Sequence, residues 1–238
     1  MFNVILIETH NCCNRRCWFC KFGQSPGGKR VFLHLDLIVK IAKELKAISY
    51  AGRISLFGID EPLLDERLVD IVAIFRQACP DAFIQITTNG DLLDSCLYNE
   101  LKFVGLSSLS ISLYDADSED KIRARLGDRL SEIKLIEMRD PLYLENRAGS
   151  IPISAPIPDC GCGRPSNMLI VKATGKIVLC CADMYGAVEM GDIKKQKLQE
   201  VWHSEKFEYY RSRLTLSRKD LFLCEKCSHS GSTSSVFV

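Results

Sequence analysis

Two groups of cysteines hold the residues of this 238-residue chain that are best suited to chemistry. The chain has 12 cysteines, and all but Cys79 and Cys96 belong to one of these groups. No export signal precedes them, so this number of cysteines indicates metal or redox chemistry rather than disulfides. The first group comprises Cys12, Cys13, Cys17 and Cys20, and the second comprises Cys160, Cys162, Cys180, Cys181, Cys224 and Cys227.

In the first group, Cys13, Cys17 and Cys20 follow a C-x3-C-x2-C spacing that leaves out Cys12. Soft thiolates at this spacing suit an iron–sulfur cluster, and three of them on a cluster of four irons leave one iron open for chemistry. We expect Cys12 to pack as a small apolar residue. A zinc site, with Cys12 or His10 as the fourth ligand, is the alternative, although a packing or capping role is expected for His10.

The elements that must position these residues alternate along the first 150 positions. The apolar pattern predicts helices at 35–48, at 68–75 after Asp65 as N-cap, and at 92–101, with Cys79 and Cys96 as core residues. This alternation predicts βαβ units with a parallel sheet, whose functional groups gather at the carboxyl ends of the strands. The predicted strands are 4–8, 53–58, 82–90 and 106–114.

The pattern changes near Ser150, so we predict domains at 1–150 and 151–238. Two apolar runs around Ala173-Thr174-Gly175-Lys176 predict a hairpin, and 198–214 predicts a helix before a cysteine-bearing loop. The predicted fold class is α/β: a partial, truncated parallel β/α barrel with a small C-terminal hairpin-plus-helix iron–sulfur domain. A net charge of +1 gives no reason to expect nucleic acid or a charged membrane surface as partner. No segment is long enough to span a bilayer, which predicts a cytoplasmic protein.

The order of motifs resembles the radical S-adenosylmethionine (SAM) superfamily. The C-x3-C-x2-C loop follows the first strand and is followed by "FGIDEPLL", "TTNGDLL" and "SISLYD" at 57–64, 87–93 and 110–115. The resemblance implies a 4Fe–4S cluster on Cys13, Cys17 and Cys20, whose open iron binds SAM. It also implies cleavage of SAM to a 5′-deoxyadenosyl radical that abstracts hydrogen from a substrate.

The same resemblance assigns the SAM-binding residues. The acid that meets the SAM amino group is Asp60 or Glu61, and Glu61 is favoured because it precedes Pro62. Arg123 is expected to hold the SAM carboxylate together with Ser112, and the alternative for Arg123 is a solvated helix face. The implied SAM-binding residues are Phe19 against adenine, Gly58, Asp60, Glu61, Asn89, Ser112 and Arg123.

The second group resembles the SPASM/twitch extension of the superfamily, with one auxiliary 4Fe–4S cluster. The implied ligands are Cys162, Cys180, Cys224 and Cys227, while Cys160 competes with the first and Cys181 with the second. A zinc ribbon is the alternative here. A cluster with four protein thiolates has no open iron, so its expected use is to accept or relay an electron.

These features are similar to those of aminocyclitol dehydrogenases in the superfamily. They imply a two-electron oxidation of a small hydroxylated, aminocyclitol or sugar-like substrate, with an external electron donor such as flavodoxin or ferredoxin. Arg147, expected at the end of a short strand at the barrel mouth, is the candidate substrate contact, with a surface salt bridge as the alternative. Because the first strand begins almost at once, no room is expected for a peptide-binding domain. Radical modification of a ribosomal peptide and a non-catalytic zinc- or cluster-binding module are the alternatives.

Overall fold

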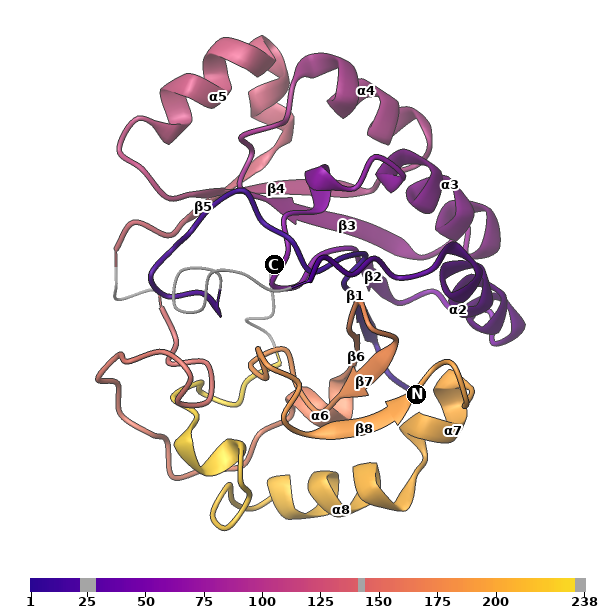
Figure 1. Ribbon diagram of the computed structural model, residues 1–238, viewed down its shortest axis with the longest axis vertical. Coiled ribbons are helices and arrows are strands. Elements are labelled where there is room, and N and C mark those ends of the chain that lie inside the picture. Colours follow the sequence, from indigo (N-terminus) through magenta and orange to yellow (C-terminus); the bar gives the residue numbers. More distant parts are fainter. Residues whose placement is uncertain (22–28, 141–143, 234–238) are drawn as a thin grey trace.

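A single mixed sheet organises the protein, as a computed structural model that describes residues 1–21, 29–140 and 144–233 shows (Figure 1). The strand order is β5-β4-β3-β2-β1-β6-β7-β8. The strands from β5 to β6 in this order pair in parallel, and β7 and β8 continue the sheet antiparallel. Their bounds are Val4–Ile7 (β1), Arg53–Ser55 (β2), Phe83–Thr88 (β3), Ser108–Leu113 (β4), Lys134–Glu137 (β5), Met168–Val171 (β6), Lys176–Val178 (β7) and Glu189–Asp192 (β8).

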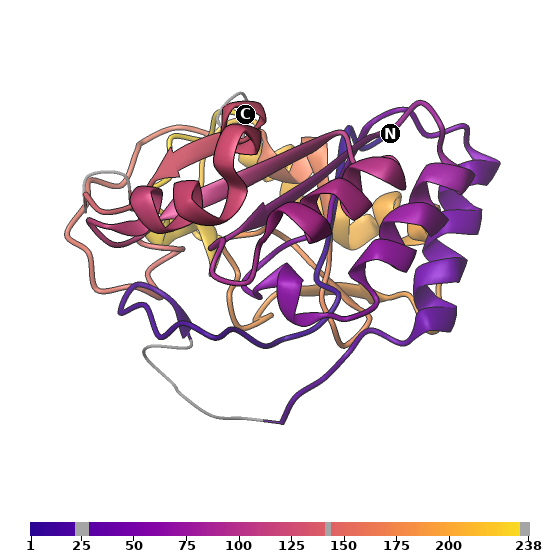
Figure 2. The same cartoon turned by 90° about the horizontal axis from the view of Figure 1, so that it is seen from above.

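Four helices follow one another along the outer side of strands β1 to β5 (Figures 1 and 2). They begin at polar residues in two cases, because the side chain of His34 accepts the Asp36 N–H and Asp94 accepts the Leu97 N–H. The parallel β/α arrangement predicted from the alternating pattern is confirmed. The helices are Leu35–Ala47 (α2), Leu68–Ala78 (α3), Ser95–Phe103 (α4) and Ser118–Leu126 (α5).

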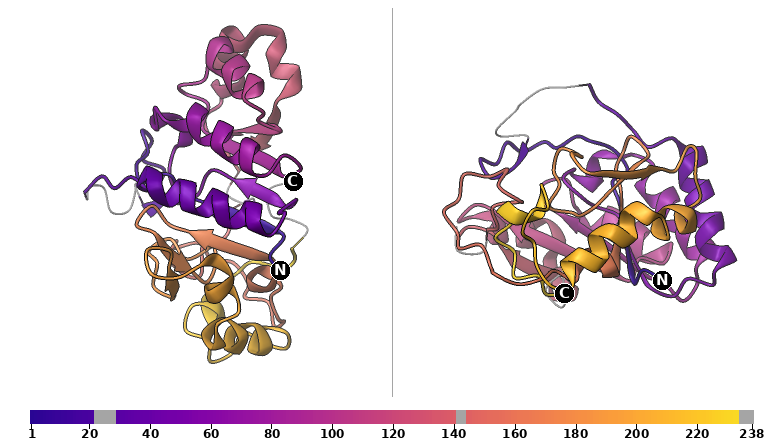
Figure 3. Two further views of the ribbon diagram at one scale, coloured as in Figure 1. Left: turned by 90° about the vertical axis from the view of Figure 1, so that its right-hand side faces the viewer. Right: turned by 90° about the horizontal axis from the view of Figure 1, so that it is seen from below.

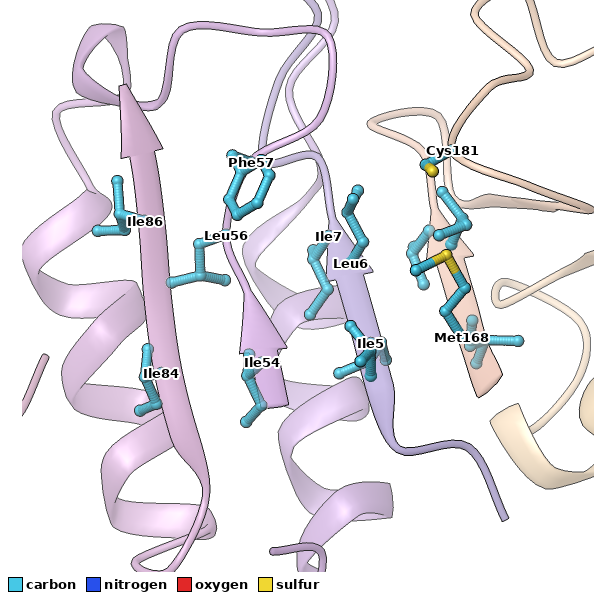
Figure 4. Packing of buried hydrophobic residues seen from close by; sticks show 14 of the residues in the cluster. Ile5, Leu6, Ile7, Ile54, Leu56, Phe57, Ile84, Ile86, Met168 and Cys181 are labelled. Atoms are coloured by element: carbon cyan, nitrogen blue, oxygen red, sulfur yellow. The ribbon is translucent and has the colours of Figure 1, made fainter. Parts of the chain in front are cut away.

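The core lies between this helical layer and the strands. Ile5, Ile54 and Ile84 point from adjacent strands into the same apolar layer, and each is fully buried (Figure 4). Strand β1 is buried along its whole length because it has strands on both edges. Apolar burial of this extent fixes the register of the strands, so the loops at their carboxyl ends are held in defined positions.

The C-terminal part extends the same sheet. Strand β6 pairs in parallel with β1, and the predicted hairpin is confirmed, with Ile170 opposite Val178 and Gly175 in the left-handed region at φ +84°. Helices α7 and α8, drawn in orange, lie at the opposite end of the molecule from α4 and α5 (Figures 1 and 3). The helices of the C-terminal part are Arg164–Asn167 (α6), Leu198–Trp202 (α7) and Glu205–Leu214 (α8). The boundary near Ser150 stays a prediction.

Three local predictions are corrected. Asp65 is not the N-cap of α3: that residue is Arg67, whose N–H is bonded to the Asp65 carboxylate. The predicted helix over 198–214 is two helices, because Ser204 caps a new one by accepting the Phe207 N–H. Cys79 is buried as expected, but Cys96 lies on the exposed side of α4. In the described part of the chain, no helix has the length and apolar character that a membrane span requires.

Candidate functional site

One cavity at the carboxyl ends of the parallel strands collects most of the predicted site residues. Its wall comes from the cysteine loop after β1, the loop after β2, the ends of β3 and β4, and the turn at Arg147. Residues more than 130 positions apart in the sequence therefore face one space. The predicted residues that line it are Cys13, Cys17, Phe19, Cys20, Gly58, Asp60, Glu61, Asn89, Ser112 and Arg147.

The three thiols of the C-x3-C-x2-C loop share this cavity. Burial, with Cys17 and Cys20 nearby, raises the pKa of Cys13 to about 12. Cys12 lies outside the cavity wall, is half-buried and accepts a hydrogen bond from Arg30 Nε at 3.1 Å, so it does not pack as a buried apolar residue. Across residues 1–21, 29–140 and 144–233, no three His, Cys, Asp or Glu side chains converge tightly enough for a single metal ion. Three thiols spread around a cavity suit a larger polynuclear group.

Arg15 fixes the cysteine loop to the strand ends, a role that the sequence did not reveal. Its guanidinium bonds Asp91 at 2.6 Å after β3 and Asp115 at 2.8 Å after β4, and it lies over the Tyr114 ring at 5.2 Å. The two carboxylates raise its pKa, so the guanidinium stays charged. The sequence does contain an arginine between the cysteines and an aspartate after each of two predicted strands, and this pattern could have indicated the contact. The bidentate contact holds the loop in one orientation.

His10 supports the same loop from below. Its Nδ1 accepts the Cys12 N–H at 3.0 Å, so Nε2 carries the proton and donates to the Glu61 carbonyl at 3.1 Å. Burial lowers the pKa of His10 and keeps the ring neutral. The expected capping role is confirmed, because the ring joins the cysteine loop to the acidic loop.

Asp60 and Glu61, the two candidate acids, differ in their partners. The Glu61 carboxylate accepts hydrogen bonds from the Thr88 hydroxyl, the Asn89 N–H at 2.8 Å and the Leu63 N–H at 3.1 Å. Both Asp60 oxygens are buried and have no hydrogen-bond partner among the described residues. Burial raises the pKa of Asp60, and the nearby Glu8 raises it further. Asp60 is therefore the acid whose oxygens remain available to a cationic group in the cavity.

Gly58 leaves room for a buried ion pair. Glu8 binds Lys172 at 2.6 Å and accepts the Ile59 N–H at 3.2 Å, directly beneath the Gly58 backbone. A Cβ on Gly58 would lie 2.2 Å from Glu8 Cγ, so no side chain fits there. Glu8 and Lys172 were not singled out from the sequence; each follows or ends an apolar strand, where a charged residue is unusual.

Two aromatic side chains, Phe19 and Tyr114, form part of the cavity wall, and the contact of Phe19 with adenine stays a prediction. The Phe19 ring stacks on the Tyr114 ring with 5.9 Å between centroids, while Trp18 is exposed. The structure does not bring Arg123 to the cavity. Arg123 lies on the solvent face of α5 and pairs with Glu119 one turn earlier, at 2.8 Å. The solvated alternative for Arg123 is the observed placement.

Arg147 reaches the cavity from a turn. The described residues directly before it, 144–146, form no strand, so the predicted short strand is not found there; residues 141–143 lie outside the described residues. Arg147 and Ala148 both adopt left-handed backbone conformations, at φ 46° and 54°. Asn146 holds this turn against the late cysteine segment: Nδ2 donates to the Lys226 carbonyl at 2.7 Å and Oδ1 accepts the Ser228 N–H at 2.9 Å.

A second cavity brings together the four predicted auxiliary ligands. Cys162, Cys180, Cys224 and Cys227 line it, along with Ala148 and two arginines. Cys160 is exposed and lies near Ser230 and Arg218 instead, and Cys181 is not part of the wall. Four thiols around one space fit a fully ligated 4Fe–4S cluster. The placement agrees with the predicted choice of Cys162 and Cys180 over their neighbours.

Comparison with known proteins finds two family matches along the chain. Residues 7–137, more than half of the chain, match the radical SAM superfamily, and residues 160–228 match the SPASM iron-sulfur cluster-binding domain. The S-adenosyl-L-methionine-dependent 2-deoxy-scyllo-inosamine dehydrogenase of Niallia circulans is 29% identical, over 96% of this chain and 94% of that protein. The GTP 3′,8-cyclase of Stenotrophomonas maltophilia (strain R551-3) is 32% identical over 56% of this chain and 40% of that protein.

Solved structures extend the similarity to three dimensions. The crystal structure of BtrN in complex with AdoMet and 2-DOIA has a TM-score of 0.88 and 28% identity, covering 97% of this chain and 94% of that one. The structure of anSMEcpe with bound AdoMet, 12% identical with a TM-score of 0.55 over 94% and 84% of the two chains, shares the fold. The chain therefore belongs to the radical SAM superfamily and is an enzyme that uses S-adenosylmethionine and 4Fe–4S clusters, with the auxiliary cluster in its SPASM domain.

Proposed function

We propose that this enzyme oxidises a hydroxyl-bearing carbon of a small aminocyclitol or sugar-like substrate to a ketone, removing two electrons. The observation that carries the proposal is the short turn between the two cysteine cavities. Arg147 lines the first cavity and its neighbour Ala148 lines the second. A substrate bound at Arg147 would thus have an electron acceptor on the other side of one turn. The full-length similarity to a 2-deoxy-scyllo-inosamine dehydrogenase supports this substrate class.

When bound on Cys13, Cys17 and Cys20, the cluster and SAM supply a 5′-deoxyadenosyl radical that removes a hydrogen atom from the substrate. Around them, Arg15 holds the cysteine loop in place through its two carboxylate partners. We assign to Asp60, rather than Glu61, the contact with the SAM ammonium group, because Asp60 is the one of these two acids whose oxygens accept no hydrogen bond from the described residues.

The substrate is oriented by Arg147, whose guanidinium can donate to neighbouring hydroxyl groups but cannot act as a base. Phe19 and Tyr114 form an apolar side of the cavity. Conversion of the carbinol to a ketone releases two electrons and two protons. The hydrogen atom carries one of each, so one electron and one proton remain to be removed. The four-cysteine cavity would hold the acceptor of that electron, and the remaining proton would pass to water in the cavity. An external donor such as flavodoxin or ferredoxin would reduce the first site.

Isotope transfer tests the reaction. 2-Deoxy-scyllo-inosamine deuterated at its reacting carbinol carbon should place deuterium in 5′-deoxyadenosine, with one ketone formed for each SAM cleaved. Cys162→Ala should cleave SAM but form no ketone, whereas Cys160→Ala, outside the cavity wall, should remain active. Deuterium that arrives only from a labelled peptide would contradict the small-molecule substrate and favour peptide modification. Ketone formation by the Cys162 variant would remove the auxiliary site from the electron route.

A further inference from the structure

The auxiliary cavity contains a buried positive charge as well as four thiols. Arg164 is only 4% exposed and lines the cavity with Cys162 and Cys180. Its Nε–H has no hydrogen-bond partner among the described residues. Its Nη1 lies 3.4 Å from the Glu145 carboxylate, which is a long contact for an ion pair. A buried, unused N–H donor on a residue that shares a cavity wall with four thiols is costly unless something in the cavity accepts it.

A second buried arginine in the same wall gives a direct comparison. Arg218 is 3% exposed, but its guanidinium donates to the backbone carbonyls of Cys227 at 3.0 Å and Gly161 at 3.1 Å and also to that of His229. Its donors therefore hold the C-terminal loop together. Arg164 makes no such backbone contacts through its side chain in the described residues, so the two arginines have different roles.

We propose that Arg164 sets the reduction potential of the auxiliary 4Fe–4S cluster by donating its free N–H to a sulfur of that cluster or of a ligating cysteine. Reduction adds one negative charge to the cluster, and a nearby guanidinium stabilises the reduced form more than the oxidised form. A hydrogen bond to sulfur acts in the same direction. A higher potential makes the cluster a better acceptor for the single electron that the substrate must lose. This role as electron acceptor rests on the proposed function.

Glu145 acts against Arg164. Its carboxylate is shared between Arg164 at 3.4 Å and His229 at 3.3 Å, and it lies at the start of the turn that carries Arg147. A negative charge beside the guanidinium offsets part of the positive field at the cavity. Removing the charge of Glu145 should therefore move the potential in the opposite direction to removing the charge of Arg164.

The test is a potentiometric titration of the anaerobically reconstituted full-length enzyme, followed by electron paramagnetic resonance without substrate. A Cys13/Cys17/Cys20→Ala chain identifies the auxiliary signal. In Arg164→Gln we expect the ratio of reduced to oxidised auxiliary cluster, at a fixed solution potential, to fall about tenfold, a shift of about 59 mV for one electron. Arg164→Lys should shift less, and Glu145→Gln should shift to more positive potential. Arg213→Gln, an exposed arginine of the same domain, should leave the potential unchanged.

An unchanged potential in a fully loaded Arg164→Gln enzyme would overturn the proposal. If that variant lost its iron, the Arg164→Lys and Glu145→Gln variants would be measured instead. If both held their clusters at the wild-type potential, Arg164 would contribute to folding alone. Shifts of opposite sign would support the proposal even then. Because no substrate is present, this result is independent of the isotope experiment, and either proposal can fail while the other stands.

Discussion

Asp60 is a buried carboxylate whose oxygens accept no hydrogen bond of good geometry in the described residues. Its two oxygens are buried and unpaired in the described structure, and burial together with Glu8 raises its pKa. A carboxyl whose pKa is higher in the folded than in the unfolded chain lowers stability once the pH exceeds its unfolded pKa, because folding then buries a charge or takes up a proton. A bound ammonium group would compensate for that charge.

We therefore expect Asp60→Asn to stabilise the SAM-free protein and to weaken SAM binding. Without SAM, the variant should melt at a higher temperature than the wild type at pH 8. The difference should shrink as the pH falls through the raised pKa, where Asp60 is neutral as well. SAM affinity at pH 8 should fall about tenfold, which is typical for the loss of one charge-assisted hydrogen bond. Calorimetry with and without SAM measures both effects.

Glu61→Gln provides the matched comparison. It should lower the melting temperature, because the Glu61 carboxylate accepts hydrogen bonds from Thr88, Asn89 and Leu63. Should Glu61→Gln weaken SAM binding at an unchanged melting temperature while Asp60→Asn binds normally, the assignment of the two acids would have to be reversed.

Gly58 shows why a motif residue can be required for packing. The Glu8 side chain cannot move away from an added Cβ without breaking its bonds to Lys172 and Ile59. Gly58→Ala should therefore destabilise the protein by about 3 kcal/mol, as expected when a buried ion pair is broken. Urea unfolding measures this change. Gly58→Ala in a Glu8→Ala chain is the control: the three atoms nearest to the added Cβ all belong to Glu8, so without that side chain the substitution should cost much less. An equal loss with and without the Glu8 side chain would show that Glu8 does not limit Gly58.

At the scale of elements, the turn at Arg147 depends on one asparagine. Asn146→Ala removes the side-chain bonds to Lys226 and Ser228, which should cost about 1–3 kcal/mol. Arg147 would then no longer be fixed, so KM for the cyclitol should rise about tenfold while iron content stays complete. Ser228→Ala removes only the hydroxyl that accepts the Asn146 N–H and should have the smaller effect. An unchanged KM in the Asn146 variant would mean that other contacts position the turn.

The strands and helices could be predicted because their apolar periodicity lies within short stretches of sequence. Several contacts of the site join residues that are far apart in the sequence, so no local pattern predicts them. Arg15 was missed because its partners Asp91 and Asp115 lie 76 and 100 residues away. Arg123 was misplaced because a sequence pattern does not say which face of α5 meets the cavity, and Glu119 one turn away holds it in solvent. The spacing of the cysteines pointed to two groups, and the fold places Cys162, rather than Cys160, in the wall of the second cavity; the ligand assignments stay predictions.

The molecule as a whole is built on one sheet that crosses the predicted domain boundary. Strand β1 pairs with β2 on one edge and with β6 on the other. Residues 1–158 alone would leave β1, an apolar strand, as an open edge. We expect that fragment to aggregate or to unfold without a cooperative transition, while the full chain unfolds in one step by circular dichroism. A fragment with a sharp transition and native helix content would establish the N-terminal part as an independent folding unit.

The pairing of β1 with β6 also orders events during synthesis. The first cysteine loop leaves the ribosome directly after β1. Glu8, at the start of that loop, can form its ion pair with Lys172 only after β6 has been synthesised and has paired with β1. Some 150 further residues must be translated before the loop has its final support. Iron delivered earlier would meet three thiols on an unsupported loop, so cluster insertion should follow the pairing of β6 with β1. The maturation machinery would then meet both cysteine cavities at the same time, on a finished sheet.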